Sequence, residues 1–140
     1  MAFLKLMKGT GYALHIIYYM AQHSNFNPIQ LKTISEALDL PENYMSKVLQ
    51  TLNKANIINS FRGSKRGYRL AKKPEDITLL EIIEIFEGPV NNISCLLDSD
   101  NCIFGECIFK KTIDDLSACA SSTLSKISIK DLVSNQEKKR

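Results

Sequence analysis

Residues 57–70, IINSFRGSKRGYRL, contain an apolar segment, a basic turn bounded by glycines and a second apolar segment. The first segment, residues 57–61, is rich in β-compatible side chains, and Tyr68-Arg69-Leu70 alternates as a returning strand would. Residues 62–67 join the two segments, so the pattern predicts a β-hairpin. The tip of this hairpin carries three cations, Arg62, Lys65 and Arg66.

Two short helices are predicted before the hairpin. The first covers residues 31–38, Asp39-Leu40-Pro41 breaks it, and the second begins at Pro41 and extends to about residue 55. Two short helices joined by a tight turn, the second polar on its outer side, are typical of a helix-turn-helix. With the hairpin they predict a winged helix-turn-helix, a mainly α fold with a small β-hairpin. We expect the buried side of the second helix to consist of Tyr44, Val48, Leu49 and Leu52.

Further helices are predicted on both sides of this unit. A helix over residues 10–23 carries a core-facing stripe. Another begins at Thr78, whose spacing to Glu81 is that of a capping box, and Gly88-Pro89 ends it. A second capping pattern at Ser128 precedes a short helical turn, and residues 135–140 are expected to fray. The stripe of the first helix consists of Tyr12, Ala13, Ile16, Ile17, Met20 and Ala21.

A long amphipathic helix is predicted over residues 107–126. Because nothing else in the chain would cover its apolar stripe, we expect a second copy of the chain to do so in a homodimer. The stripe consists of Phe109, Ile113, Leu116, Ala120, Leu124 and Ile127. Cys119 lies beside it and is expected to be a small buried side chain. The predicted organisation is therefore a winged helix-turn-helix over residues 1–89, a cysteine-bearing loop over 90–107, and a dimerisation helix with its tail over 108–140.

Charge is distributed unevenly along the chain. Residues 54–73 contain seven basic side chains and no acid, and residues 75–87 contain five acids and no base. An uninterrupted basic block is typical of a surface that binds phosphates, although a solvated charged face is the simpler alternative. No apolar run is long enough to span a membrane. We therefore expect a cytoplasmic protein whose cysteines begin as thiols.

Three cysteines, Cys95, Cys102 and Cys107, follow the winged helix with the spacing Cys-x6-Cys-x4-Cys. Three thiolates from one loop can hold three corners of an iron–sulfur cluster or three of four zinc positions. They can also act without metal, by oxidation to a disulfide. A cysteine enzyme is not expected, because the two histidines lie in or near the first helix and no base is placed beside a thiol.

Several motifs together resemble the Rrf2 family of bacterial winged-helix regulators, of the IscR, NsrR and RirA type. They are residues 41–52, the wing pattern Arg-Gly-x-Lys-x-Gly-Tyr-Arg-Leu-Ala over 62–71, Ile77-Thr78-Leu79 and Glu87-Gly88-Pro89. The resemblance implies a homodimer on a near-palindromic DNA operator, with the long helices exchanged between protomers. It also implies that the three cysteines hold a [2Fe-2S] or [4Fe-4S] cluster near the first helix of the partner chain.

The same resemblance implies which residues read DNA. The helix that begins at Pro41 would enter the major groove with Tyr44, Ser46 and Lys47 near the bases. Arg62 matches the wing arginine that enters the minor groove. Lys65 and Arg66 are expected to contact phosphates, which position the protein without specifying sequence. The simpler alternative for each cation is a solvated surface side chain that does not contact DNA.

The fourth cluster ligand is where the sequence departs from the family pattern. Isc-type members place a histidine shortly after the last cysteine, and position 110 here is Lys. Nitric-oxide-sensing members use an aspartate from the partner's first helix, and alignment places Gly11 there. His15 lies one helical turn further on the same face, so it is a candidate ligand from the partner chain, although a dimer-contact histidine with no ligand role is the simpler alternative. Other candidates are Asp98, Asp100, Glu106, a small thiol or water.

The sequence therefore predicts a DNA-binding repressor controlled by an iron–sulfur cluster that senses iron, nitric oxide or redox state. The alternative is a repressor switched by its thiols alone.

Overall fold

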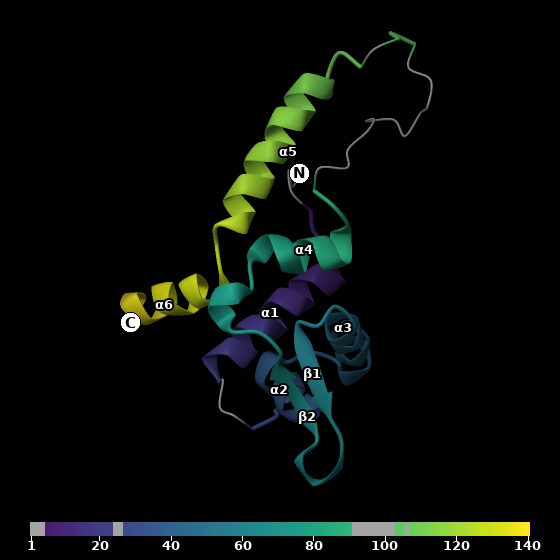
Figure 1. Cartoon of the computed structure of the whole chain (residues 1–140). Helices are drawn as coiled ribbons and strands as arrows, with labels where there is room; N and C mark the ends of the chain where they lie inside the picture. The colour runs from purple at the N-terminus through teal and green to yellow at the C-terminus, as the bar shows by residue number, and fades with distance from the viewer. Residues whose placement is uncertain (1–4, 24–26, 91–102, 106) are drawn as a thin grey trace.

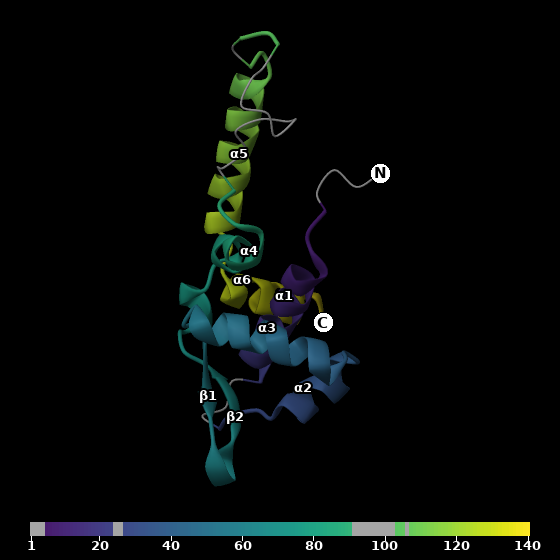
Figure 2. The same cartoon turned by 90° about the vertical axis from the view of Figure 1, so that its right-hand side faces the viewer.

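The computed structural model of the chain describes residues 5–23, 27–90, 103–105 and 107–140. A compact head contains α1 (Lys8–Gln22), α2 (Leu31–Leu38), α3 (Glu42–Lys54) and α4 (Leu79–Glu87). Strands β1 (Ile58–Phe61) and β2 (Gly67–Leu70) form an antiparallel hairpin between α3 and α4. In both views α5 (Lys110–Ser125) projects from the head on the side opposite the hairpin tip (Figures 1 and 2). The predicted class, mostly helical with one hairpin, is confirmed.

Helix α1 forms the centre of the head. It contacts α2, α3, α4, β2 and the C-terminal helix α6 (Ile129–Lys139). Its predicted stripe is confirmed, since Ala13, Ile16 and Ile17 are fully buried, while Tyr12 is only partly buried. Burial of apolar side chains from every surrounding element against one helix is the main stabilising contribution to this core.

Helices α2 and α3 form the predicted helix-turn-helix. Asp39 ends α2 in a left-handed conformation with φ of 52°, and Pro41 precedes the first residue of α3. The buried side of α3 consists of Met45, Val48, Leu49 and Leu52. The prediction that Tyr44 belongs to this side is wrong, because Tyr44 is 40% exposed and Met45 fills the core position.

The hairpin register pairs Ile58 with Leu70 and Phe61 with Gly67. A short 3-10 helix, η1 (Gly63–Lys65), forms the tip in place of an open loop. On its other edge, β2 is bridged to Ile29, which precedes α2. The hairpin is therefore fixed to the segment before the helix-turn-helix along the edge of β2, while its tip extends away from the head (Figure 2).

The C-terminal residues return to the head. Ser128 and Asp131 form a capping box that starts α6, and Ile129 is fully buried in the core. The backbone N–H of Ile129 donates to the Ile77 carbonyl at 2.8 Å, which joins α6 to the segment before α4. Residues 135–139, expected to fray, are helical.

Helix α5 has two different faces. Ser117 is buried, and Ile113, Ala120 and Leu124 are partly buried on the side that packs toward α4. Phe109 and Leu116 are 52% and 51% exposed, so the predicted single stripe divides between a covered and an uncovered face. Cys119 is exposed in the single chain, contrary to the expectation of burial. None of the helices in the described residues is long and apolar enough to cross a membrane.

Candidate DNA interface and cysteine segment

The hairpin tip presents cations to solvent. Arg62, Lys65 and Arg66 are all exposed around η1. Gly63 has φ of 89°, a conformation that glycine adopts without the strain a side chain would add. Two guanidinium groups and one ammonium group on a narrow protruding turn form a surface that can contact a polyanion.

A groove of about 650 Å³ lies between the hairpin and the two helices of the helix-turn-helix. It brings Arg62 and Arg66 together with Gln50 and Asn53 from α3 and Lys32 from α2. Glu42 also lines it. Cations interleaved with amide side chains suit a sugar–phosphate strand, which is recognised by charge and hydrogen bonding together.

The groove adds residues that the sequence did not single out. Gln50 and Asn53 belong to the side of α3 that was expected only to be polar, and Lys32 had no assigned role. Lys32 could have been found from the sequence, because it is a basic side chain in the first turn of the helix that precedes the predicted recognition helix. Of the described residues predicted to meet DNA, four lie outside the groove lining: Tyr44, Ser46, Lys47 and Lys65. Lys47 is exposed on α3, and Ser46 is half-buried there.

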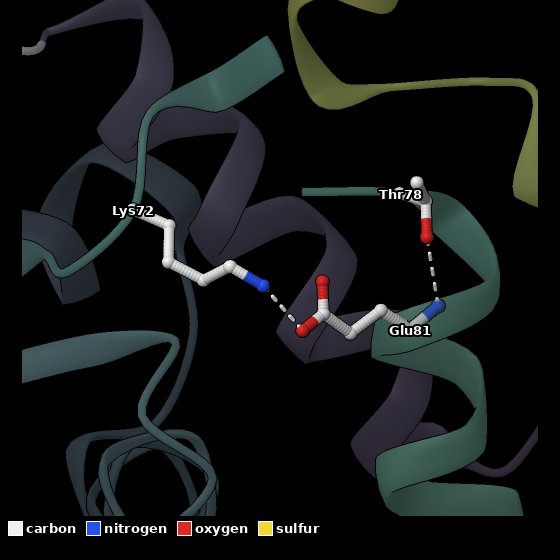
Figure 3. A network of polar contacts seen from close by, with 3 residues as sticks. All are labelled: Lys72, Thr78 and Glu81. Atoms are coloured by element: carbon white, nitrogen blue, oxygen red, sulfur yellow. Dashed lines mark hydrogen bonds and ion pairs between the residues drawn. The ribbon is translucent and has the colours of Figure 1, made fainter. Parts of the chain in front are cut away.

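The basic block over residues 54–73 is not one continuous DNA-facing surface. Lys72 Nζ lies 2.6 Å from Glu81 Oε1, and the backbone N–H of Glu81 donates to Thr78 Oγ1 at 3.2 Å (Figure 3). The Arg69 guanidinium lies over the Phe61 ring, 4.9 Å from its centroid. Arg69 therefore packs on a ring of β1 and Lys72 joins the segment after β2 to α4, whereas the tip cations Arg62, Lys65 and Arg66 are exposed.

Tyr44 is held by α1. Its ring meets the Tyr12 ring edge to face, with centroids 4.9 Å apart and an interplanar angle of 86°. Pairs of aromatic rings favour this edge-to-face geometry over a perfect face-to-face stack. The start of α3 is consequently positioned by α1 as well as by its own buried side.

The cysteine segment is described only in part. Cys95 and Cys102 lie outside the described residues, as do Asp98, Asp100 and Glu106. Cys107 is partly buried just before α5, in a shallow hollow of about 630 Å³ lined also by Lys110, Lys111, Asp114 and Asp115. Two lysines and two aspartates therefore surround this thiol, so their formal charges offset one another. Within residues 5–23, 27–90, 103–105 and 107–140, no group of three or more His, Cys, Asp or Glu is arranged to hold a metal.

Three further positions bear on a cluster. Lys110, at the position where Isc-type members have histidine, pairs with Asp114 at 3.2 Å. Cys119 lies roughly 14 Å along the axis of α5 from Lys110, since a helix rises about 1.5 Å per residue, so it is too far to share a cluster with Cys107. His15 is exposed on α1, and its Nδ1 lies 2.6 Å from the Gly11 carbonyl oxygen. A carbonyl only accepts, so Nδ1 donates in this contact, and in a neutral imidazole with this tautomer Nε2 carries the lone pair.

Known proteins are similar to this chain over nearly all of its length. A family profile described as "Rrf2: Iron-dependent Transcriptional regulator" matches residues 6–135. The regulator NsrR of Shouchella clausii is 27% identical over 96% of this chain and 91% of its own length.

Solved structures of two regulators resemble this chain over most of its length. T. potens IscR is 27% identical with a TM-score of 0.81, covering 99% of this chain and 92% of that one. CymR, the global cysteine regulator of B. subtilis, is also 27% identical, with a TM-score of 0.79 over 94% of this chain and 98% of that one. These relatives are transcriptional regulators, and the family is not one of enzymes, which confirms that expectation. The chain belongs to the Rrf2 family of transcriptional regulators.

Proposed function

We propose that the protein is a homodimeric repressor whose operator binding is controlled by an iron–sulfur cluster held by Cys95, Cys102 and Cys107. The observation that carries this proposal is the donor set: three closely spaced cysteines, the last of them accessible beside two lysines. Iron–sulfur clusters are held by cysteine thiolates, and three such ligands lie within thirteen residues of this sequence. Likeness to NsrR and IscR and the iron-dependent description of the family support it.

The DNA-reading part of the proposal rests on the head. Lys47 and Ser46 would face bases in the major groove, with Tyr44 beside them, and Arg62 would enter the adjacent minor groove. Lys65 and Arg66 would hold phosphates. A dimer related by a two-fold axis would present two such heads to a near-palindromic site. The uncovered face of α5, with Phe109 and Leu116, would form the contact between protomers.

His15 from the partner's α1 is the proposed fourth ligand. The contact of its Nδ1 with the Gly11 carbonyl leaves Nε2 as the free lone pair, which is the arrangement that metal-binding histidines use. His15→Ala should then alter the visible spectrum of the cluster and hasten its loss. An unchanged spectrum and lifetime would exclude His15 and leave a side chain of the loop, a thiol or water at that corner.

Anaerobic purification followed by iron and acid-labile sulfide analysis tests the cofactor. We expect coloured protein with stoichiometric sulfide, lost in Cys107→Ser and retained in the matched variant Cys119→Ser. Selection of binding sites from a random duplex library tests the partner, and we expect a near-palindromic sequence. Selection of no sequence would contradict the DNA-binding part independently of the cofactor.

A switch based on thiols alone is the second candidate. It is favoured by the accessible thiol of Cys107 and the likeness to a protein described as a global cysteine regulator, and the disulfide would join two of Cys95, Cys102 and Cys107. Formation of a disulfide would require an oxidant such as a peroxide. Colourless protein that binds DNA when reduced and releases it after peroxide treatment would establish this candidate in place of the cluster.

A further inference from the structure

One side chain joins two helix ends that are distant in sequence. Glu87, the last residue of α4, accepts hydrogen bonds at Oε1 from the Met7 backbone N–H and from Thr10 Oγ1, each at 2.6 Å. Thr10 is fully buried. Helix α1 has neither a side-chain cap of its own nor an acid in its first turn. Glu87 therefore supplies both the capping acceptor and the negative charge that a helix N-terminus favours.

The same turn of α1 supports the start of α3. A side-chain carbon built on Gly9 would lie 3.6 Å from the Tyr44 hydroxyl and 3.6 Å from the Phe86 ring. Gly9 is itself buried, so α3 and α4 approach the α1 backbone closely from two directions. One turn further along α1, Tyr12 meets the Tyr44 ring. Moving the first turn of α1 would thus move the surface on which Tyr44 rests.

We propose that the Thr10–Glu87 contact is a positioning contact, which sets the orientation of Tyr44 and of the first turn of α3 for operator reading. The inference rests on the proposed function, in that α3 is taken to enter the major groove. Helices in contact shift as packed units, because close-packed interiors transmit displacement rather than absorb it. The hydrogen bond from the buried Thr10 hydroxyl to the Glu87 carboxylate should be strong, since hydrogen bonds to charged acceptors are stronger than those to neutral acceptors.

The contact also lies where a signal could act. Glu87 belongs to the Glu87-Gly88-Pro89 motif, and the segment with Cys95 and Cys102 follows this motif directly in the sequence. Any change of that segment that displaces the end of α4 would act first on Glu87, then on α1 and then on Tyr44. The physical requirement for such coupling is a contiguous chain of contacts, and the described residues provide it from Glu87 to Tyr44.

The test uses the full chain labelled with 3-fluorotyrosine. The fluorine resonance of Tyr44 is identified by its disappearance in Tyr44→Phe. Thr10→Val keeps the shape of the side chain and removes the hydroxyl, whereas Thr10→Ser keeps the hydroxyl. Glu87→Ala removes the acceptor at an exposed position, where folding is expected to survive. Glu84→Gln, one turn earlier on α4, is the matched control.

We expect Thr10→Val and Glu87→Ala to shift the Tyr44 resonance and to weaken binding to the selected operator about fivefold more than binding to random duplex, at the low end of allosteric couplings. Thr10→Ser and Glu84→Gln should resemble the parent chain. An unmoved Tyr44 resonance in Glu87→Ala, or equal losses on operator and random DNA, would overturn the inference. If the parent chain selects no DNA, the proposed function fails, and the fluorine shift still decides whether Glu87 positions Tyr44.

Discussion

Ile29 and Tyr68 exchange two backbone hydrogen bonds of 2.8 Å each, so residue 29 acts as a third strand at the edge of the hairpin. This bridge joins the wing to the start of the helix-turn-helix, and it requires glycine at position 67. Gly67 has φ of 145°, and a side-chain carbon there would lie 2.6 Å from the Ile29 carbonyl oxygen. The relative placement of wing and recognition helix therefore depends on a close approach of two backbones.

Gly67→Ala should destabilise the protein strongly. The positive φ costs a side chain about 1–2 kcal/mol, and forced overpacking adds about 1–3 kcal/mol. Gly63→Ala is the matched control, because Gly63 also has positive φ but faces open space. Urea unfolding at one fixed protein concentration measures both variants. Equal losses of unfolding free energy would show that the approach to Ile29 is not the reason for Gly67.

Asp131 should make the stability of α6 depend on pH. The backbone N–H of Ser128 donates to its carboxylate at 3.0 Å and, with the Ser128 hydroxyl, holds the pKa of Asp131 below its ordinary value of 3.8. A carboxyl whose folded pKa is depressed stabilises the fold above its unfolded pKa, and the contribution disappears as pH falls through the folded pKa. The advantage of the parent chain over Asp131→Asn should therefore be present at neutral pH and shrink below about pH 4.

Urea unfolding of the two proteins at a series of pH values measures this difference. Glu137→Gln, an exposed change on the same helix, is the control and should show no comparable trend. A difference between the parent chain and Asp131→Asn that stays constant from neutral to acid pH would contradict a role for the charge.

Local signals were sufficient to predict most elements. The hairpin was predicted because its turn residues and its strand alternation lie within residues 57–70. The start of α4 was predicted because the capping pattern joins residues three positions apart: Thr78 indeed accepts from the Glu81 backbone, whereas the Glu81 carboxylate binds Lys72. Such signals come from residues that are close in sequence, and the tertiary structure here keeps the elements that they predict.

The features that could not be predicted depend on residues far apart in sequence. Thr10 and Glu87 are 77 positions apart, and neither the periodicity of α1 nor that of α4 indicates their contact. Tyr44 was placed in the core because its spacing suits the apolar stripe of α3. A neighbouring position, Met45, is as apolar and is the one that faces inward. Helical spacing defines the buried face only to within about one residue. Tertiary packing therefore decides which of two adjacent side chains faces the core.

Arg62 and Lys65 should differ in what they contribute to DNA binding. Arg62→Ala should weaken binding to the selected operator by about 1–3 kcal/mol and relax specificity, as the loss of a base contact does. Lys65→Ala should weaken operator and random DNA alike and lower the salt dependence by about one unit of slope, as the loss of a phosphate contact does. Fluorescence anisotropy titrations across a range of salt concentrations separate the two. Equal effects of Arg62→Ala on both DNAs would assign Arg62 to the phosphates as well.

Leu116 should decide the oligomeric state. Its side chain is 51% exposed on α5, on the same uncovered face as Phe109 and Cys119. Large apolar side chains on one face of a projecting helix indicate a surface that another chain covers, and a charge placed there would lose its hydration on association. Leu116→Asp should therefore convert a dimer into a monomer, as measured by analytical ultracentrifugation. Ser122→Asp introduces the same charge at an exposed position of the same helix and should leave the dimer intact. A dimer that persists in Leu116→Asp would place the interface elsewhere, and the exposed stripe of α5 would then need another partner.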